Sequence, residues 1–142
     1  MLPRGIVDCV NDLSKRQQFS SGSAYEPVLG YSRAVRVGPW VAVSGTTASS
    51  PDGVVGGADA GEQAREVLRR IAAALDQAGA ELANVVRTRV FLTDIADFDA
   101  VGRTHGEFFG DIRPTTTVVA VSALADPALR VEIEADAIVP DA

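Results

Sequence analysis

The stretch LRVEIEADAIV (residues 129–139) alternates between apolar and charged side chains from Leu129 to Ala137. Its two sets are Leu129, Val131, Ile133, Ala135 and Ala137 on one side, and Arg130, Glu132, Glu134 and Asp136 on the other. Successive side chains of a strand point to opposite faces, so a repeat of two residues is typical of a strand with one face buried. The stretch therefore predicts a strand of a sheet that has a core on one side.

The segments upstream extend this sheet. NVVRTRVFL (84–92) also alternates, and TTTVVAV (115–121) follows the Arg113–Pro114 break. YSRAVRV (31–37) and WVAVSG (40–45) are β-compatible and are separated by Gly38–Pro39, which favours a hairpin. The chain is thus expected to contribute five strands.

Two helices are expected between the strands. Asp59, followed by Glu62, is a plausible capping box for a helix over 59–78, which Gly79 ends. Its apolar residues recur at helical spacing and are Ala64, Val67, Leu68, Ile71, Ala72 and Leu75. A second helix covers about 97–109. The order β-β-α-β-α-β-β predicts an α+β fold, a single mixed sheet with both helices on one face.

The uncovered face of that sheet has a consequence for assembly. Strand 84–92 is expected to show Val86, Thr88, Val90 and Leu92 on one face and Val85, Arg87, Arg89 and Phe91 on the other. Both sets are partly apolar, although helices cover only one of them. A half-apolar open face is usually buried against another copy, so we expect an oligomer whose sheets face a shared axis.

The domain organisation is simple. A chain of 142 residues supports one core. Residues 1–23 are expected to be an N-terminal extension that ends in the linker Ser20–Ser23. It is either flexible or a short docked helix with Ile6, Cys9, Val10 and Leu13 on one stripe. Residues 24–142 form the single domain.

Composition excludes several function classes. One cysteine and one histidine rule out an intrachain disulfide, a zinc-finger ligand set or an iron–sulfur cluster, and we expect neither a metal nor a cofactor. A net charge of −6 disfavours nucleic acid as a partner. Apolar runs are too short for a membrane span, and the N-terminus lacks the order of a signal peptide, so the expected location is cytoplasmic.

Five stretches together resemble the Rid family (the YjgF proteins, long labelled translation inhibitors or endoribonucleases). They are GYSRAV (30–35), VAVSGTT (41–47), VVRTRVFLTDIADF (85–98), RPTTTVV (113–119) and VEIEADAI (131–138). The resemblance covers about residues 26–139. It implies a chorismate-mutase-like fold, assembled as a homotrimer with a small-molecule pocket at each subunit junction.

The resemblance also implies a chemistry. The best-known branch hydrolyses imines and enamines to a 2-keto acid and ammonia, and it clamps the substrate carboxylate with an arginine two residues after a proline. Here Thr116 occupies that position after Pro114. Glu132 matches the water-handling glutamate of the family. The pocket tyrosine corresponds to Tyr31, and a Ser-Gly pair to Ser44–Gly45. The chain thus resembles a Rid protein outside the arginine-bearing branch.

Each site residue also has a structural interpretation. Glu132 shares its strand face with Glu134 and Asp136, and the three are candidates for an ion-pair ladder with Arg87 and Arg89. The resemblance favours function for Glu132 alone.

Other residues are weighed in the same way. Arg33 points the same way as Tyr31. Either Arg33 or Arg130 is a candidate to supply, from another position, the positive charge of the arginine that Thr116 replaces. His105 lies on the apolar stripe of the second helix and is interpreted as structural.

Three functions follow, in order of preference. The first is a hydrolase of imines, enamines or related C–N substrates, and the second is a non-catalytic trimer that binds a metabolite. The third, a ribonuclease or translation inhibitor, is disfavoured by the acidity and the single histidine.

Overall fold

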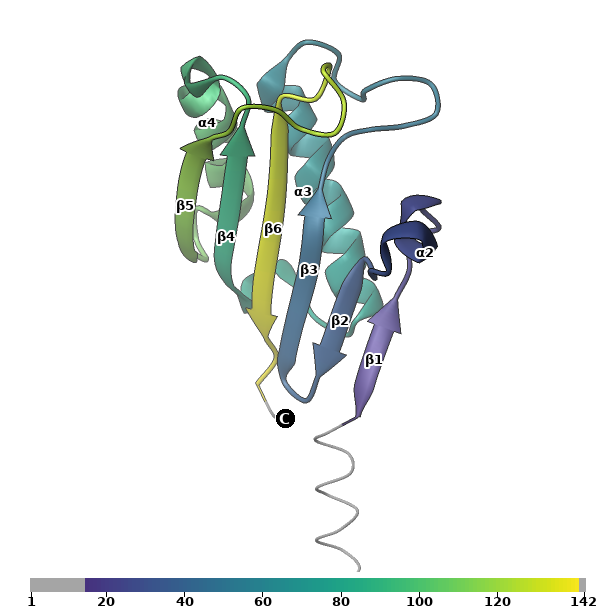
Figure 1. The fold of residues 1–142 in the computed structure, drawn as a ribbon. Helices are drawn as coiled ribbons and strands as arrows, with labels where there is room; N and C mark the ends of the chain where they lie inside the picture. The colour runs from purple at the N-terminus through teal and green to yellow at the C-terminus, as the bar shows by residue number, and fades with distance from the viewer. Residues whose placement is uncertain (1–14, 141–142) are drawn as a thin grey trace, which may run out of the picture.

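A computed structural model describes residues 15–140 and shows one mixed sheet of six strands (Figure 1). The strand order is β1-β2-β3-β6-β4-β5, and only β4 and β5 run parallel. The strands are β1 (Arg16–Phe19), β2 (Ala34–Val37), β3 (Trp40–Thr46), β4 (Val85–Leu92), β5 (Thr115–Ala120) and β6 (Val131–Ile138). Although β6 is last in sequence, it lies between β3 and β4, so the C-terminal strand joins the two halves of the sheet.

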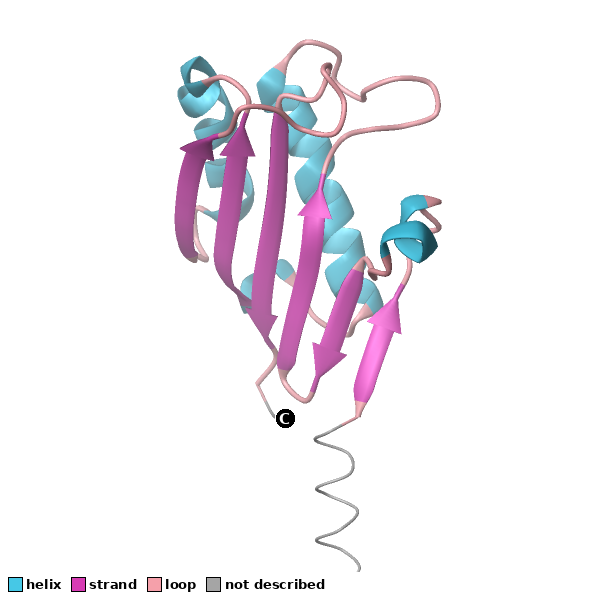
Figure 2. Cartoon of the chain, viewed as in Figure 1, coloured by secondary structure: helices cyan, strands magenta, loops and turns pink. Residues whose placement is uncertain are grey.

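Two long helices cover one face of the sheet. Figures 1 and 2 show α3 (Ala60–Gln77) and α4 (Phe98–Phe109) behind the strands, with no long helix in front of them. This confirms the single mixed sheet with both long helices on one face. Shorter elements are α2 (Tyr25–Leu29) and the 3-10 turns η1 (Leu82–Asn84) and η2 (Ile95–Asp97). No helix within residues 15–140 is long and apolar enough to cross a membrane.

Helix α3 begins and ends where its sequence indicates. The Asp59 carboxylate accepts a hydrogen bond from the backbone N–H of Glu62 at 3.1 Å. After the helix, Gly79 has φ +76°, a left-handed conformation that glycine adopts readily. Arg36 on β2 donates to the carbonyl of Ala78 at 2.7 Å, so a cation satisfies an end of the helix that carries partial negative charge.

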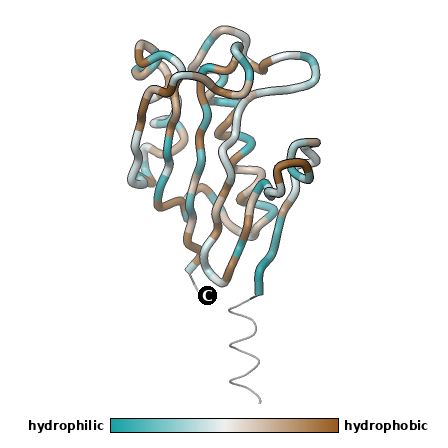
Figure 3. The backbone as a smooth tube through the Cα atoms, viewed as in Figure 1, coloured by the Kyte–Doolittle hydropathy of each residue, from teal (hydrophilic) through white to brown (hydrophobic). Residues whose placement is uncertain are grey.

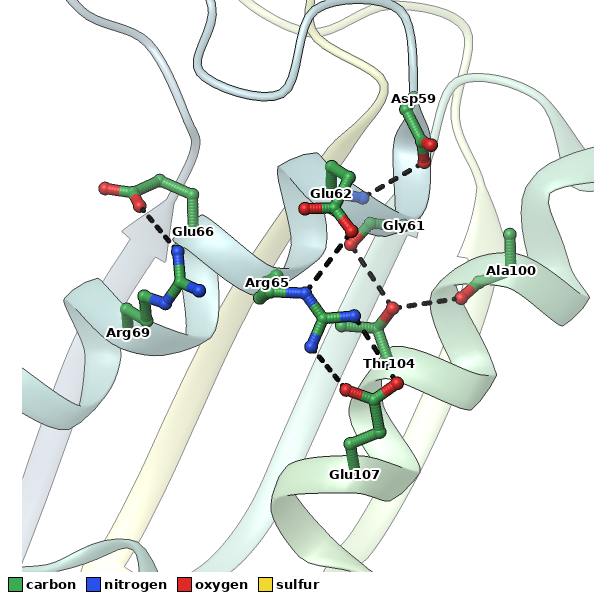
Figure 4. A network of polar contacts seen from close by, with 9 residues as sticks. All are labelled: Asp59, Gly61, Glu62, Arg65, Glu66, Arg69, Ala100, Thr104 and Glu107. Atoms are coloured by element: carbon green, nitrogen blue, oxygen red, sulfur yellow. Dashed lines mark hydrogen bonds and ion pairs between the residues drawn. The ribbon is translucent and has the colours of Figure 1, made fainter.

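Helices α3 and α4 are joined by the polar contacts drawn in Figure 4. Arg65 forms ion pairs with Glu62 on its own helix and with Glu107 on α4. The Thr104 hydroxyl donates to the carbonyl of Gly61 at 3.2 Å, where the helices come close. These contacts fix α4 over β4 and β5, the part of the sheet that carries Thr116.

The strand faces follow the sequence pattern with one correction. All five apolar residues listed above for 129–137 are buried, and Figure 3 shows the alternation of hydropathy along the central strands. On β4, however, Val85 is buried and Val86 is exposed, the reverse of the expectation. The pairing with β6 is irregular between Val85 and Arg87, and a bulge there shifts the phase of the alternation.

The N-terminal segment also differs from the expectation. Arg16–Phe19 forms strand β1, which pairs antiparallel with β2, so the sheet begins before the expected boundary at residue 24. Phe19 packs against the core. Ser21 and Ser23 donate to the buried carboxylate of Glu26. The stripe of Ile6, Cys9, Val10 and Leu13 lies outside the described residues.

Candidate functional site

A bulge in β3 lies at the centre of the candidate site. Val43 pairs with Ala135 and Thr46 pairs with Ile133, so Ser44 and Gly45 together stand opposite a single residue of β6. The bulge interrupts the regular ladder and turns backbone groups away from it. Sequence reasoning selected Ser44 and Gly45 by resemblance, and the bulge is the physical feature that distinguishes them.

Arg33 holds this bulge together. Its Nη1 donates to the carbonyl oxygen of Gly45 and to the hydroxyl of Thr46, both at 2.9 Å. The guanidinium carbon also lies 5.8 Å from the centroid of the Tyr31 ring, within range of a cation–π contact. Arg33 therefore fixes Tyr31 and the bulge relative to each other.

Glu132 lies directly against Gly45. A Cβ at residue 45 would overlap the carboxylate oxygen Oε1 of Glu132. Glycine at this position leaves room for the carboxylate where it lies, and a larger residue would require the Glu132 side chain to move; the φ of Gly45 is not positive, so backbone strain is not the reason. Tyr31, Arg33, Ser44, Gly45 and Glu132 thus come together at the junction of β2, β3 and β6; this group is called the Glu132 cluster below.

The Glu132 carboxylate is half-buried and has a raised pKa. Burial is the main cause and the charge of Glu134 adds to it, while the nearby Arg33 acts in the opposite direction. The other acidic side chains of this strand face are paired: Arg89 lies 3.1 Å from Glu134 and 3.6 Å from Asp136. Among residues 15–140, Glu132 has no ion-pair partner within 4.0 Å.

The expected ion-pair ladder is present in part: Arg89 pairs with Glu134 and Asp136, whereas neither Glu132 nor Arg87 forms an ion pair within residues 15–140. Glu134 has the structural role that the sequence analysis gave it. The cross-strand neighbour of Glu132 on β4 is Phe91 rather than an arginine. A half-buried carboxylate that is not neutralised by a partner is suited to take up and return a proton.

Thr116 is not part of the Glu132 cluster within one subunit. It lies on the edge strand β5, which β4 separates from β6. Its hydroxyl oxygen lies 2.7 Å from that of Thr88, and the Thr88 hydroxyl lies 2.8 Å from Nε2 of His105 on α4, so the three groups are joined by hydrogen bonds. The side chain of Thr116 is therefore on the helix-covered side of the sheet, whereas Glu132 is on the open side.

The remaining candidates are placed elsewhere. Arg130 forms an ion pair with Asp97 at 3.1 Å and borders a hollow of about 470 Å³ at the loop end of the sheet. Of the two arginines considered as relocated cations, only Arg33 lies beside Glu132. No group of three or more metal-ligating side chains occurs in the described part of the chain.

His105 is packed as expected for a residue on the apolar side of α4. Its ring centroid lies 4.7 Å from that of Phe109, and burial lowers its pKa. Sequence reasoning missed its partner Thr88, which is fully buried. The available signal was a hydroxyl at an inward position of an otherwise apolar strand face.

The sequence and the fold match a known class of proteins. The family model for endoribonuclease L-PSP matches residues 21–139. The chain is 33% identical to the human 2-iminobutanoate/2-iminopropanoate deaminase, over 87% of this chain and 90% of that protein. It is 36% identical to a RutC family protein of Pyrococcus abyssi, over 79% of this chain and 88% of that protein.

A solved structure agrees with these relationships. The crystal structure of a YjgF/YER057c/UK114 family member from Mycobacterium tuberculosis superposes with a TM-score of 0.81 at 54% identity. The superposition covers 88% of this chain and 100% of the chain from Mycobacterium tuberculosis. The chain belongs to the endoribonuclease L-PSP family, also called the Rid, YjgF or RutC family.

Proposed function

We propose that the protein hydrolyses imines, enamines or related C–N substrates, in a pocket at the subunit junction of a homotrimer. The observation that supports this most directly is Glu132, a half-buried carboxylate with a raised pKa that lies against Gly45 and has no ion-pair partner within the described residues. Such a group can hold a water molecule and accept its proton as it attacks.

The reaction needs only one proton acceptor and oriented hydrogen bonds. Water adds to the carbon of the C=N bond, and its proton passes through Glu132 to the nitrogen. The hydroxyl proton of the resulting carbinolamine then passes by way of Glu132 to the NH2 group, the C–N bond breaks, and ammonia leaves the carbonyl compound behind. Backbone groups of the bulge at Ser44–Gly45 are the nearest candidates to orient the substrate, and Tyr31 forms a wall held by Arg33.

We propose a pocket at the subunit junction because the two parts of the site lie apart within a single subunit. The Glu132 cluster and Thr116 lie on different strands and on opposite faces of the sheet. A second copy would have to bring the edge strand β5, with Thr116, to the open face of the first. Several apolar side chains on that open face are exposed in one subunit, among them Trp40, Val86, Val119 and Ile138.

The substrate class is narrowed by Thr116. We place the chain outside the arginine-bearing branch, because a threonine hydroxyl offers a hydrogen bond but no charge where that branch has its carboxylate clamp. Arg33 holds the bulge through its Nη1, so only its Nε and Nη2 would be available to a ligand. A charge-assisted bond contributes ~1.5–3 kcal/mol, or roughly 10- to 150-fold in affinity, so 2-imino acids should be poor substrates.

The test compares hydrolysis of 2-iminopropionate by the native chain and three variants. Thr116→Arg should gain roughly 10-fold or more in kcat/KM. Adding Glu132→Gln to the Thr116→Arg variant should lower its kcat/KM by about 100-fold or more. Glu134→Gln is the matched control, because it lies two residues along the same strand face but is held by Arg89.

The results separate the proposed function from the alternatives. A native chain as active as an arginine-bearing relative would contradict the role given to Thr116. Absence of turnover in both the native chain and Thr116→Arg, with binding of a 2-keto acid retained, would favour a metabolite-binding trimer. RNA cleavage is the least supported function, because a net charge of −6 disfavours a phosphate backbone and the chain has a single histidine.

A further inference from the structure

Hydrogen bonds join three residues, His105, Thr88 and Thr116, into a relay that the reaction above does not use. It starts at the imidazole on α4, passes through the fully buried hydroxyl of Thr88 and ends at Thr116 on the exposed edge strand. The two links measure 2.8 and 2.7 Å. The relay therefore connects a buried ring to the surface position where the arginine-bearing branch has its clamp.

The protons of this relay can be counted. Thr88 has one hydroxyl proton, which it can donate either to Thr116 or to Nε2 of His105; in the first of these two directions it donates to Thr116. Thr88 then has only a lone pair for His105, so the ring must carry its proton on Nε2. The hydroxyl proton of Thr116 is left free, because no acceptor for it occurs among residues 15–140.

The opposite direction has a different outcome at the surface. If the ring proton were on Nδ1, Thr88 would donate to Nε2 and Thr116 would donate to Thr88. Thr116 would then present only lone pairs to a ligand. The tautomer of His105 thus decides whether the end of the relay is a donor or an acceptor.

We propose that His105 is a positioning residue whose Nε2–H form directs the Thr116 hydroxyl proton outward, so that the edge of β5 selects a ligand oxygen, carbonyl or carboxylate. The placement of Thr116 in the pocket rests on the function proposed above. The two hydrogen bonds of the series, and the third that a ligand would add, would run in one direction and strengthen one another. The lowered pKa of His105 favours the neutral ring, the form in which the two tautomers exist.

The first experiment reads the tautomer in the ligand-free protein. The chain has a single histidine, so the imidazole ¹⁵N signals of the full-length protein belong to His105. We expect the Nε2–H form in the native chain. In Thr116→Val, Thr88 loses its acceptor and can turn its proton to Nε2, so the Nδ1–H population should rise. Thr117→Val, on the other face of the same strand, should leave the spectrum unchanged.

The second experiment uses pyruvate, a stable 2-keto acid, as the probe. Pyruvate should shift the His105 signals of the native protein. Thr88→Val should abolish that shift and weaken pyruvate binding by about 3- to 10-fold, the effect of one hydrogen bond. Thr88→Ser keeps the hydroxyl and should restore both. A purely structural role of Thr88 would change stability without this change in the His105 response.

The outcomes distinguish this proposal from the proposed function. A native Nδ1–H form, or a tautomer that Thr116→Val does not alter, overturns the proposal even if the protein is an active hydrolase. Equal pyruvate affinity in Thr88→Val and Thr117→Val does the same. A native chain that shows the expected tautomers but neither binds pyruvate nor hydrolyses an imine contradicts the proposed function, and with it the ligand selection inferred for Thr116.

Discussion

At the scale of single residues, Glu132 has a proposed role that would come at the expense of the stability of the fold. Burial raises its pKa, so the folded protein favours the neutral carboxyl while the reaction needs the ionised one. Its neighbour Glu134 has the opposite situation, since Arg89 holds its charge at the surface of the same strand. Two glutamates two residues apart therefore differ in role because their neighbours differ.

This difference predicts the pH dependence of stability. The pKa of Glu132 is raised on folding above its ordinary value of 4.5, so its contribution to stability is complete below that pH and is lost as pH rises through the raised pKa. Glu132→Gln keeps the neutral form at every pH. It should therefore be more stable than the native chain at pH 7, and the difference should vanish below about pH 4. Urea unfolding across this range measures it.

The control variant, Glu134→Gln, should change the free energy of unfolding in the opposite direction. Glu134→Gln removes a partly exposed ion pair and should lower the free energy of unfolding at pH 7 by no more than about 1 kcal/mol. A Glu132→Gln protein that is less stable than the native chain at neutral pH would contradict the desolvation argument.

Among the secondary-structure elements, β1 is the one whose contribution differs most from the expectation. It adds a strand to the edge of β2 and brings Phe19 against the core. The turn that follows gives Glu26 its hydrogen-bond donors Ser21 and Ser23. Residues 15–23 therefore belong to the folded domain rather than to a solvated tail.

Truncation tests this directly. We expect a chain lacking residues 1–23 to be less stable than one lacking residues 1–14 by at least about 2 kcal/mol. Partial burial of Phe19 and the loss of donors to the buried Glu26 each contribute on the order of 1 kcal/mol or more. Equal denaturation midpoints of the two truncated chains would show that β1 adds nothing to the fold.

For the molecule as a whole, the open face of the sheet is the surface through which we propose that subunits associate. Trp40 and Ile138 are cross-strand partners on β3 and β6, and each exposes more than two fifths of its surface in one subunit. The Glu132 cluster lies on the same face. If subunits associate through this face, as proposed above, assembly and site formation are coupled.

A charge on this face should therefore disrupt both. Ile138→Asp should reduce the mass measured by light scattering from about three times 14.8 kDa toward that of one chain, and it should abolish hydrolysis. Ala73→Asp places the same charge on the exposed side of α3 and should leave both unchanged. A native chain that is monomeric at micromolar concentration would contradict the junction pocket.

Much of this protein follows from local sequence pattern. The alternation over 129–137 identified the buried face of β6, and the cap at Asp59 with the stop at Gly79 delimited α3. These features depend on neighbours a few residues apart, so their periodicity and capping chemistry are visible in the sequence. The same is true of the family stretches, which covered Glu132 and Ser44–Gly45.

Other features were decided only by the tertiary structure. The bulges in β3 and β4 depend on how two strands far apart in sequence are paired, and one added residue reverses the face of those beside it. Strand β1 exists because β2 offers it a free edge. Thr116 faces α4 instead of Glu132, and its hydroxyl meets Thr88 and His105, because the parallel pairing of β4 with β5 sets that register. Pairing between distant segments leaves no periodic mark in the sequence, and for this reason the relay ending at Thr116 could not be predicted from it.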